Sequence, residues 1–140
     1  MTCDLTRRRA LAGAATVGVG VPFLVACGGE GGGSATDPST PEGSPGQVLA
    51  TTAEIEVGGG AIFPAEKVVV TQPTDGDFKA FSSICTHQGC PVTSVSDGTI
   101  NCPCHGSRFS IEDGSVEGGP AGAPLPEVQI AVEGDRITLA

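Results

Sequence analysis

The sequence has 140 residues, 22 of them glycine and 11 proline, and its 16 acidic residues outnumber 7 basic ones for a formal net charge of −9. This length leaves room for one domain, and the glycine and proline content favours short strands and turns over long helices. Three of the seven basic residues lie together at positions 7–9, so the rest of the chain has no basic stretch with which to bind nucleic acid.

The N-terminal segment, residues 1–26, has the layout of an export signal. Three arginines at 7–9 precede an uncharged apolar run that extends from residue 10 to residue 26. That run contains Pro22 and is shorter than the roughly 20 apolar residues that a membrane-spanning helix needs. The arginines after Thr6 resemble a twin-arginine signal, the export route for proteins that take up cofactors before export. We therefore expect the chain to be exported, to the outer face of the cytoplasmic membrane or the periplasm of a bacterium.

The end of this segment predicts a lipid anchor. The sequence "LVAC", residues 24–27, resembles the bacterial lipobox, in which the cysteine is acylated and becomes the first residue of the mature protein. We therefore expect Cys27 to carry lipid and Cys3 to be removed with the signal. The alternative is an ordinary cleaved signal or an uncleaved anchor. The lipid would supply the membrane attachment, because an acidic chain is repelled by an anionic membrane surface.

Residues 27–47 predict a flexible tether. They are dominated by glycine, serine, proline and acidic residues and contain almost no apolar side chain. Such a segment cannot bury enough surface to offset the entropy lost on ordering. A flexible chain of this length has a typical reach of about 25 Å. The folded domain is then expected over residues 48–140.

From Val48 onward, short runs of β-branched residues alternate with turn-forming pairs. This alternation predicts an antiparallel all-β domain, with strands joined by tight turns. The predicted turn pairs are Asp75-Gly76, Asp97-Gly98, Asp113-Gly114 and Gly134-Asp135.

Two short boxes hold four of the six cysteines and both histidines. The first is "CTHQGC", residues 85–90, and the second is "CPCHGS", residues 102–107. A structural zinc site accepts these residue types, but zinc ligand pairs usually have two to four residues between them, whereas Cys85 and His87 have one. A disulfide framework suits an exported protein, but it leaves both histidines without a role. An iron–sulfur site is the third interpretation, because thiolate and imidazole both suit iron.

The two boxes resemble the Rieske iron–sulfur family, whose loops read Cys-x-His-x-Gly-Cys and Cys-x-Cys-His-x-Ser. The resemblance covers most of residues 48–140 and implies a small antiparallel Rieske-type β-sandwich. Its cluster-binding subdomain would consist of the two boxes and a proline-rich loop, "GPAGAPLP", residues 119–126. The resemblance implies one 2Fe–2S cluster, with one iron held by two cysteines and the other by two histidines. By this match the ligands are Cys85, Cys102, His87 and His105.

The same resemblance assigns roles to five further residues. Cys90 and Cys104 would pair as a disulfide, as in Rieske proteins of respiratory complexes. Ser107 matches a serine whose hydroxyl donates to a bridging sulfur and raises the potential. Phe109 stands where high-potential members carry tyrosine, so we expect a lower potential than in a member with both donors. Gln88 stands where quinol-oxidising members usually have leucine, so quinol docking is less secure than cluster binding.

The resemblance therefore implies a one-electron carrier that can couple electron uptake to proton uptake at a histidine. Its partners would be redox proteins, such as a cytochrome or a membrane oxidoreductase, with quinol as a further donor. Two functional classes stay open. The disulfide favours the iron–sulfur subunit of a cytochrome bc-type quinol-oxidising complex. The lipid anchor favours a free-standing exported carrier or the small subunit of a periplasmic oxidoreductase similar to arsenite oxidase. We expect no catalytic residue of its own and no stand-alone enzyme activity.

Overall fold

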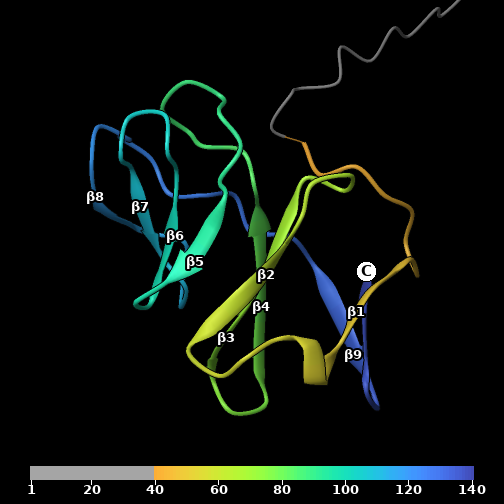
Figure 1. Cartoon of the computed structure of the whole chain (residues 1–140). Coiled ribbons are helices and arrows are strands. Elements are labelled where there is room, and N and C mark those ends of the chain that lie inside the picture. Colours follow the sequence, from red (N-terminus) through yellow and green to blue (C-terminus); the bar gives the residue numbers. More distant parts are fainter. Residues whose placement is uncertain (1–39) are drawn as a thin grey trace, which may run out of the picture. The chain divides into compact units, whose positions relative to one another are not determined.

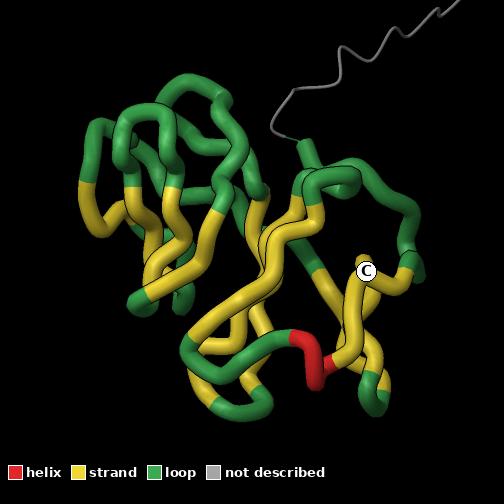
Figure 2. Tube along the Cα trace, in the orientation of Figure 1, coloured by secondary structure: helices red, strands yellow, loops and turns green. Residues whose placement is uncertain are grey.

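The computed structural model describes residues 40–140 of the chain. The predicted export signal, Cys3, Cys27 and most of the predicted tether lie outside these residues. Within the described range nearly all regular structure is strand, and a single 3-10 turn, η1 (Thr52–Glu54), is the one helical element (Figure 2). None of the described residues forms a helix long and apolar enough to cross a membrane. The predicted all-β class is confirmed.

The strands form three antiparallel sheets (Figure 1). The first has the order β1-β10-β9, the second β2-β3-β4 and the third β5-β6-β7-β8. The first box follows β4, and the second box connects β6 to β7. The strand bounds are β1 Val48–Thr51, β2 Gly59–Phe63, β3 Val68–Thr74, β4 Asp77–Ser82, β5 Ser94–Ser96, β6 Thr99–Asn101, β7 Arg108–Ser110, β8 Val116–Gly118, β9 Ile130–Glu133 and β10 Arg136–Leu139.

Each predicted turn pair connects two neighbouring antiparallel strands. Between β5 and β6, both Asp97 and Gly98 have positive φ, at 53° and 75°, as a type I′ hairpin turn requires. This geometry explains the aspartate–glycine pair, since these residues tolerate left-handed backbone conformations. The other three pairs lie between β3 and β4, between β7 and β8, and between β9 and β10.

Two hydrophobic cores lie on opposite faces of β3. Side chains alternate between the two faces of a strand, so Val68 and Val70 enter one core and Val69 enters the other. We call the first the base core; it consists of Ala50, Ile55, Val68, Val70, Ala80, Val128, Ile137 and Leu139. We call the second the loop core; it consists of Val69, Phe81, Cys85, Val92, Ile100, Cys102, Phe109, Ile111, Ala121 and Leu125.

The domain begins before the boundary expected at Val48. The carboxylate of Glu42 lies 2.7 Å from the Lys67 ammonium. The Gly46 N–H donates to the Leu139 carbonyl at 2.6 Å, and the Gln47 amide donates to a Glu66 carboxylate oxygen at 2.8 Å. The segment from 42 to 47, expected as tether, is therefore held on the domain. It is held by hydrogen bonds and an ion pair, which its polar composition could not indicate.

Candidate metal centre

The first box is a tight loop closed by its own backbone. The Cys85 N–H donates to the Cys90 carbonyl at 2.7 Å, and the Gly89 N–H donates to the Cys85 carbonyl at 2.9 Å. Gly89 has a φ of 74°, a left-handed conformation that favours glycine. The loop buries Cys85, which is 3% exposed, and leaves Gln88 on the surface.

The second box is closed by the N–H of Cys102, which donates to the Ser107 carbonyl at 2.9 Å. Strands β6 and β7 pair on either side of the box, so its two ends are held together by the sheet. Cys102 and Ser107 are buried, while Cys104 and His105 are exposed. The box therefore turns one cysteine inward and presents its histidine outward.

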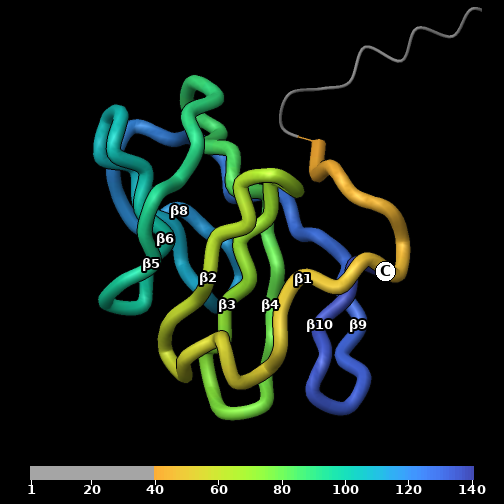
Figure 3. The backbone as a smooth tube through the Cα atoms, turned by 45° about the vertical axis from the view of Figure 1, so that its right-hand side comes forward, coloured from red at the N-terminus to blue at the C-terminus, as the bar shows by residue number. Residues whose placement is uncertain are grey.

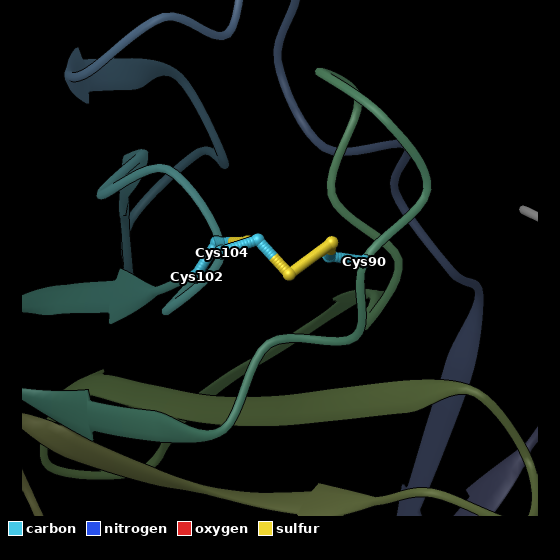
Figure 4. A group of neighbouring side chains, drawn as sticks. All are labelled: Cys90, Cys102 and Cys104. Carbon is cyan, nitrogen blue, oxygen red and sulfur yellow. A yellow bond between two sulfur atoms is a disulfide. The ribbon is translucent and has the colours of Figure 1, made fainter.

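A disulfide joins the two boxes. Cys90 and Cys104 are bonded, with their Cα atoms 6.4 Å apart, so the predicted pairing is confirmed. The Cys102 sulfur lies within 4.8 Å of both disulfide sulfurs (Figure 4). Two of these three sulfurs are bonded to each other and cannot serve as thiolate ligands. Within residues 40–140, the free thiols are those of Cys85 and Cys102.

The four predicted ligands form two pairs at different depths. Cys85 and Cys102 are each only 3% exposed. Outside them, the Nδ1 atoms of His87 and His105 face each other at 3.2 Å, and the two rings are nearly perpendicular with centroids 4.7 Å apart. His87 is half-buried and His105 is exposed. The arrangement thus offers two inner sulfur donors and two outer imidazole nitrogens.

The surroundings of Cys102 indicate that the two buried thiols, Cys85 and Cys102, need a nearby positive charge in order to ionise. Burial raises the pKa of the Cys102 thiol, and the neighbouring Cys85 thiol raises it further, while the backbone N–H groups of Cys104 and His105 act in the opposite direction. Two buried thiols side by side cannot both ionise without a compensating cation. A bound metal supplies that positive charge, and the two N–H donors are already aimed at the sulfur.

The proline-rich loop, residues 119–126, contacts both boxes. The Thr86 hydroxyl donates to the Ala123 carbonyl at 2.6 Å, and the Ala121 N–H donates to the Ser107 hydroxyl oxygen at 3.2 Å. Gly119 has a φ of 85°, and a Cβ there would lie 2.5 Å from the Ser107 Cα, so the close approach requires glycine. The sequence placed this loop at the site but did not indicate the contacts of Thr86, Gly119 and Ala121, because their partners lie 12 or more positions away.

Ser107 and Phe109 are both buried near the inner pair of thiols, Ser107 through its hydrogen bond from the Cys102 N–H and Phe109 as a member of the loop core. Because the Ser107 oxygen accepts the Ala121 N–H, its own O–H remains available as a donor. Phe109 pairs with Ile100 across β6 and β7 and is fully buried in the loop core, which also contains Cys85 and Cys102. A phenyl ring has no hydroxyl, so this position contributes packing and no hydrogen bond.

The family model of the Rieske [2Fe-2S] domain matches residues 46–129. The chain belongs to the Rieske family. Its cofactor is accordingly a Rieske-type 2Fe–2S cluster, for which one iron with two thiolates and one with two imidazoles is the expected ligation. The buried free thiols and the facing imidazoles of this Rieske domain fit that mixed set of donors.

Two curated relatives show where similar domains occur. The putative respiratory nitrate reductase subunit Rieske of Haloferax mediterranei is 40% identical over 73 residues, which are 51% of this chain and 33% of that protein. The cytochrome b6-f complex iron–sulfur subunit of Chlorobaculum thiosulfatiphilum is 37% identical over 79 residues, 56% of this chain and 42% of that protein. The Rieske chain thus spans about a third to two fifths of the length of these relatives.

A solved structure is similar over nearly its whole length. The cyanobacterial plasma membrane Rieske protein PetC3 from Synechocystis PCC 6803 is 32% identical, with a TM-score of 0.56. The match covers 66% of this chain and 97% of that one. The described Rieske domain therefore corresponds to nearly all of the chain in that solved structure.

Proposed function

We propose that this Rieske protein is a one-electron carrier in which Cys85 and Cys102 hold the inner iron and His87 and His105 hold the outer one. The observation that carries the assignment is the geometry of the pairs, with buried adjacent thiols and Nδ1 atoms that face each other at 3.2 Å. The bound cluster supplies a site that stores one electron. The disulfide and the proline-rich loop hold the two boxes in this arrangement.

The histidine side is the proposed route for electrons. His105 is exposed and His87 is half-buried, whereas both thiols are buried, so a partner protein can approach most closely at the imidazoles. The facing Nδ1 atoms leave the Nε2 atoms to hold or release a proton. Electron uptake at this site can therefore be coupled to proton uptake at His87 or His105.

The proposed location is the outer face of a bacterial cytoplasmic membrane or the periplasm. Lipid on Cys27 would attach the chain, and the residues between Cys27 and Glu42 would serve as the tether. This proposal rests on the twin-arginine-like and lipobox-like sequences. A tethered acidic domain suits transient docking to a basic redox partner, because opposite charges increase the rate of encounter.

A second candidate is the iron–sulfur subunit of a quinol-oxidising cytochrome bc-type complex. Two observations favour it, namely the disulfide between the boxes and the Chlorobaculum relative, which is named as a subunit of a cytochrome b6-f complex. Against it, the exposed residue beside His87 is the polar Gln88.

Metal analysis and paramagnetic resonance test the cluster. We expect the full chain, purified with its cofactor, to contain about two irons and, once reduced, to give the low-average-g signal of mixed histidine and cysteine ligation. His105→Cys should change that signal. Gln88→Leu, which alters the surface beside His87, should leave the signal unchanged. Zinc in place of iron, with no such signal, would overturn the proposal.

Fractionation tests the attachment and the partner. We expect the chain in the membrane fraction and labelled by fatty acid, and Cys27→Ala should lose both properties. Mild detergent extraction then separates the two candidates. Recovery of the chain by itself supports the carrier, and a stable complex with a cytochrome b supports the quinol-oxidising subunit.

A further inference from the structure

An open groove lies at the end of the described domain opposite the two boxes. Its volume is about 570 Å³. The 3-10 turn η1 with the residues after it, the β3–β4 hairpin and the β9–β10 hairpin form its walls. Figures 1 and 3 show these turns at the lower end of the domain and the boxes at the upper end. The groove is therefore separate from the proposed electron route.

The lining of the groove includes apolar side chains that are accessible to a partner. Ile55 is buried beneath it and Phe78 is half-buried. Val57 and Val132 are 58% and 45% exposed. The described residues include three exposed large hydrophobic side chains, and the third, Val48, does not line the groove. Two of the three exposed valines therefore line the same groove, where an apolar group of a partner could contact both.

The charged side chains that line the groove are all acidic. Glu56 and Asp75 line the groove, and no lysine or arginine does. Three further carboxylates lie in the same segments, at Glu54, Glu133 and Asp135, together with one cation, Arg136, which pairs with Glu133 across β9 and β10. Residues 40–140 contain 13 acidic and 4 basic side chains, so the rest of the domain provides little positive charge to offset this field.

We propose that this groove is a docking site for a protein segment that presents one or two apolar side chains flanked by lysine or arginine. The apolar side chains would bury Val57 and Val132, and the cations would pair with Glu56 and Asp75. A second copy of this chain is a poor occupant, because its own surface is acidic. An anionic membrane surface is repelled for the same reason. Docking here would hold the domain while leaving both boxes free.

A defined peptide tests this site directly. The chain contains no tryptophan or tyrosine, so the fluorescence anisotropy of the peptide Lys-Val-Lys-Trp-Lys-Val-Lys reports on the peptide alone. We expect saturable binding to the full chain at low ionic strength, weakened by salt. The double variant Val57→Ser/Val132→Ser should weaken binding by about tenfold or more. The matched control Val48→Ser removes an exposed valine outside the groove and should change nothing.

A second pair of variants tests the charge. Glu56→Gln/Asp75→Asn should also weaken binding, by about fivefold to tenfold at low salt. The Asp75 substitution keeps a turn-forming asparagine–glycine pair, so the hairpin is retained. Glu112→Gln/Glu117→Gln, an equal charge change outside the groove, is the matched control. Far-ultraviolet circular dichroism and the protection of β3 and β10 amides verify that every variant is folded around the groove.

Four outcomes would overturn the proposal. Groove variants that bind the peptide as tightly as the parent chain would show that the groove is not its site. Equal binding of a peptide with serine in place of both valines would show that the peptide binds through charge alone. A dimer in sedimentation that is lost with the two valines would make a second copy the occupant. Valine-dependent binding to phosphatidylglycerol vesicles would make a membrane surface the occupant of the groove.

Discussion

The loop core and the base core stabilise their surroundings in different ways. The strands around the loop core, β5 to β8, have three residues each, and this core contains two free thiols and lies beside the disulfide. The base core is aliphatic, and its sheets have strands of four to seven residues. A small domain buries limited surface, so regions with short strands depend on cross-links or metals. The comparison shows that cofactor and disulfide stabilise one part of this domain, and apolar burial the other.

Removing a proposed ligand should produce the largest difference in stability between the loop core and the base core. In Cys102→Ser we expect iron content and visible absorbance to fall to near background, because a hydroxyl is a poor replacement for a thiolate at iron. Amide hydrogen exchange should accelerate in the boxes and in β5 to β8. Protection in β3 and β10 should remain, because Val70 and Ile137 are fully buried in the base core. Loss of protection in both regions together would contradict the division.

Removing the disulfide should have the next largest effect. Cys90 and Cys104 are 14 residues apart, and closing a loop of that size stabilises a fold by about 3 kcal/mol. We expect Cys90→Ala/Cys104→Ala to lower the urea midpoint of the visible absorbance by a corresponding amount. The far-ultraviolet signal from the base sheets should unfold near its original midpoint.

The reciprocal variant acts on the base core. Val70→Ala leaves a cavity among aliphatic side chains and should cost about 2 kcal/mol of global stability. Its cluster absorbance and resonance signal should be unchanged, because Val70 lies on the face of β3 away from the loop core. A Val70→Ala protein that lost its cluster signal while folded would show that the two cores are not separable.

Two substitutions within the loop core should change the potential without unfolding it. Ser107→Ala removes a hydroxyl donor, and Phe109→Tyr adds one at a fully buried position. A hydrogen bond to a charged group contributes about 1.5 to 3 kcal/mol, which corresponds to about 60 to 130 mV for one electron. We expect the voltammetric midpoint to fall in the first variant and to rise in the second. A midpoint that failed to rise in Phe109→Tyr would contradict the role given to this position.

Local features of the fold could be predicted from the sequence. The hairpin turns follow from pairs such as Asp97-Gly98, whose backbone conformations few other residues adopt. The spacing of cysteines and histidines in the two boxes identifies the family, and that resemblance supplied the pairing of Cys90 with Cys104.

Contacts between distant segments could not be predicted in this way. The hydrogen bond from the Thr86 hydroxyl to the Ala123 carbonyl joins residues that are 37 positions apart. The local sequence around either residue does not indicate this contact. The groove needs side chains from three turns that are far apart in the chain, among them Val57 and Val132. Such features depend on how the sheets are arranged, and short-range propensity contains no information about that arrangement.

The smallest expected effect compares one carboxylate from each region. In the region of the loop core, Asp113 has its pKa lowered by hydrogen bonds from Ser115, first from the hydroxyl and then from the backbone N–H. Beside the base core, Glu54 has its pKa lowered first by the Thr51 N–H, at 2.7 Å, and then by the Thr51 hydroxyl. Each lowered pKa contributes to the stability of the fold. Both contributions to stability are present above the unfolded pKa values and are lost as the pH falls below about 4 through the lower folded values.

The strongest hydrogen bond comes from a hydroxyl at Asp113 and from a backbone N–H at Glu54, so deleting the hydroxyl should have different effects on the two pKa values. Ser115→Ala removes the largest cause at Asp113, so the pKa of that carboxyl should rise toward its ordinary value. Thr51→Ala retains the N–H donor, so the pKa of Glu54 should stay lowered. A nuclear magnetic resonance titration of the carboxyl carbons measures both. The opposite result, with Glu54 restored and Asp113 unchanged, would mean that the backbone donor is the weaker one at Glu54 and the stronger one at Asp113.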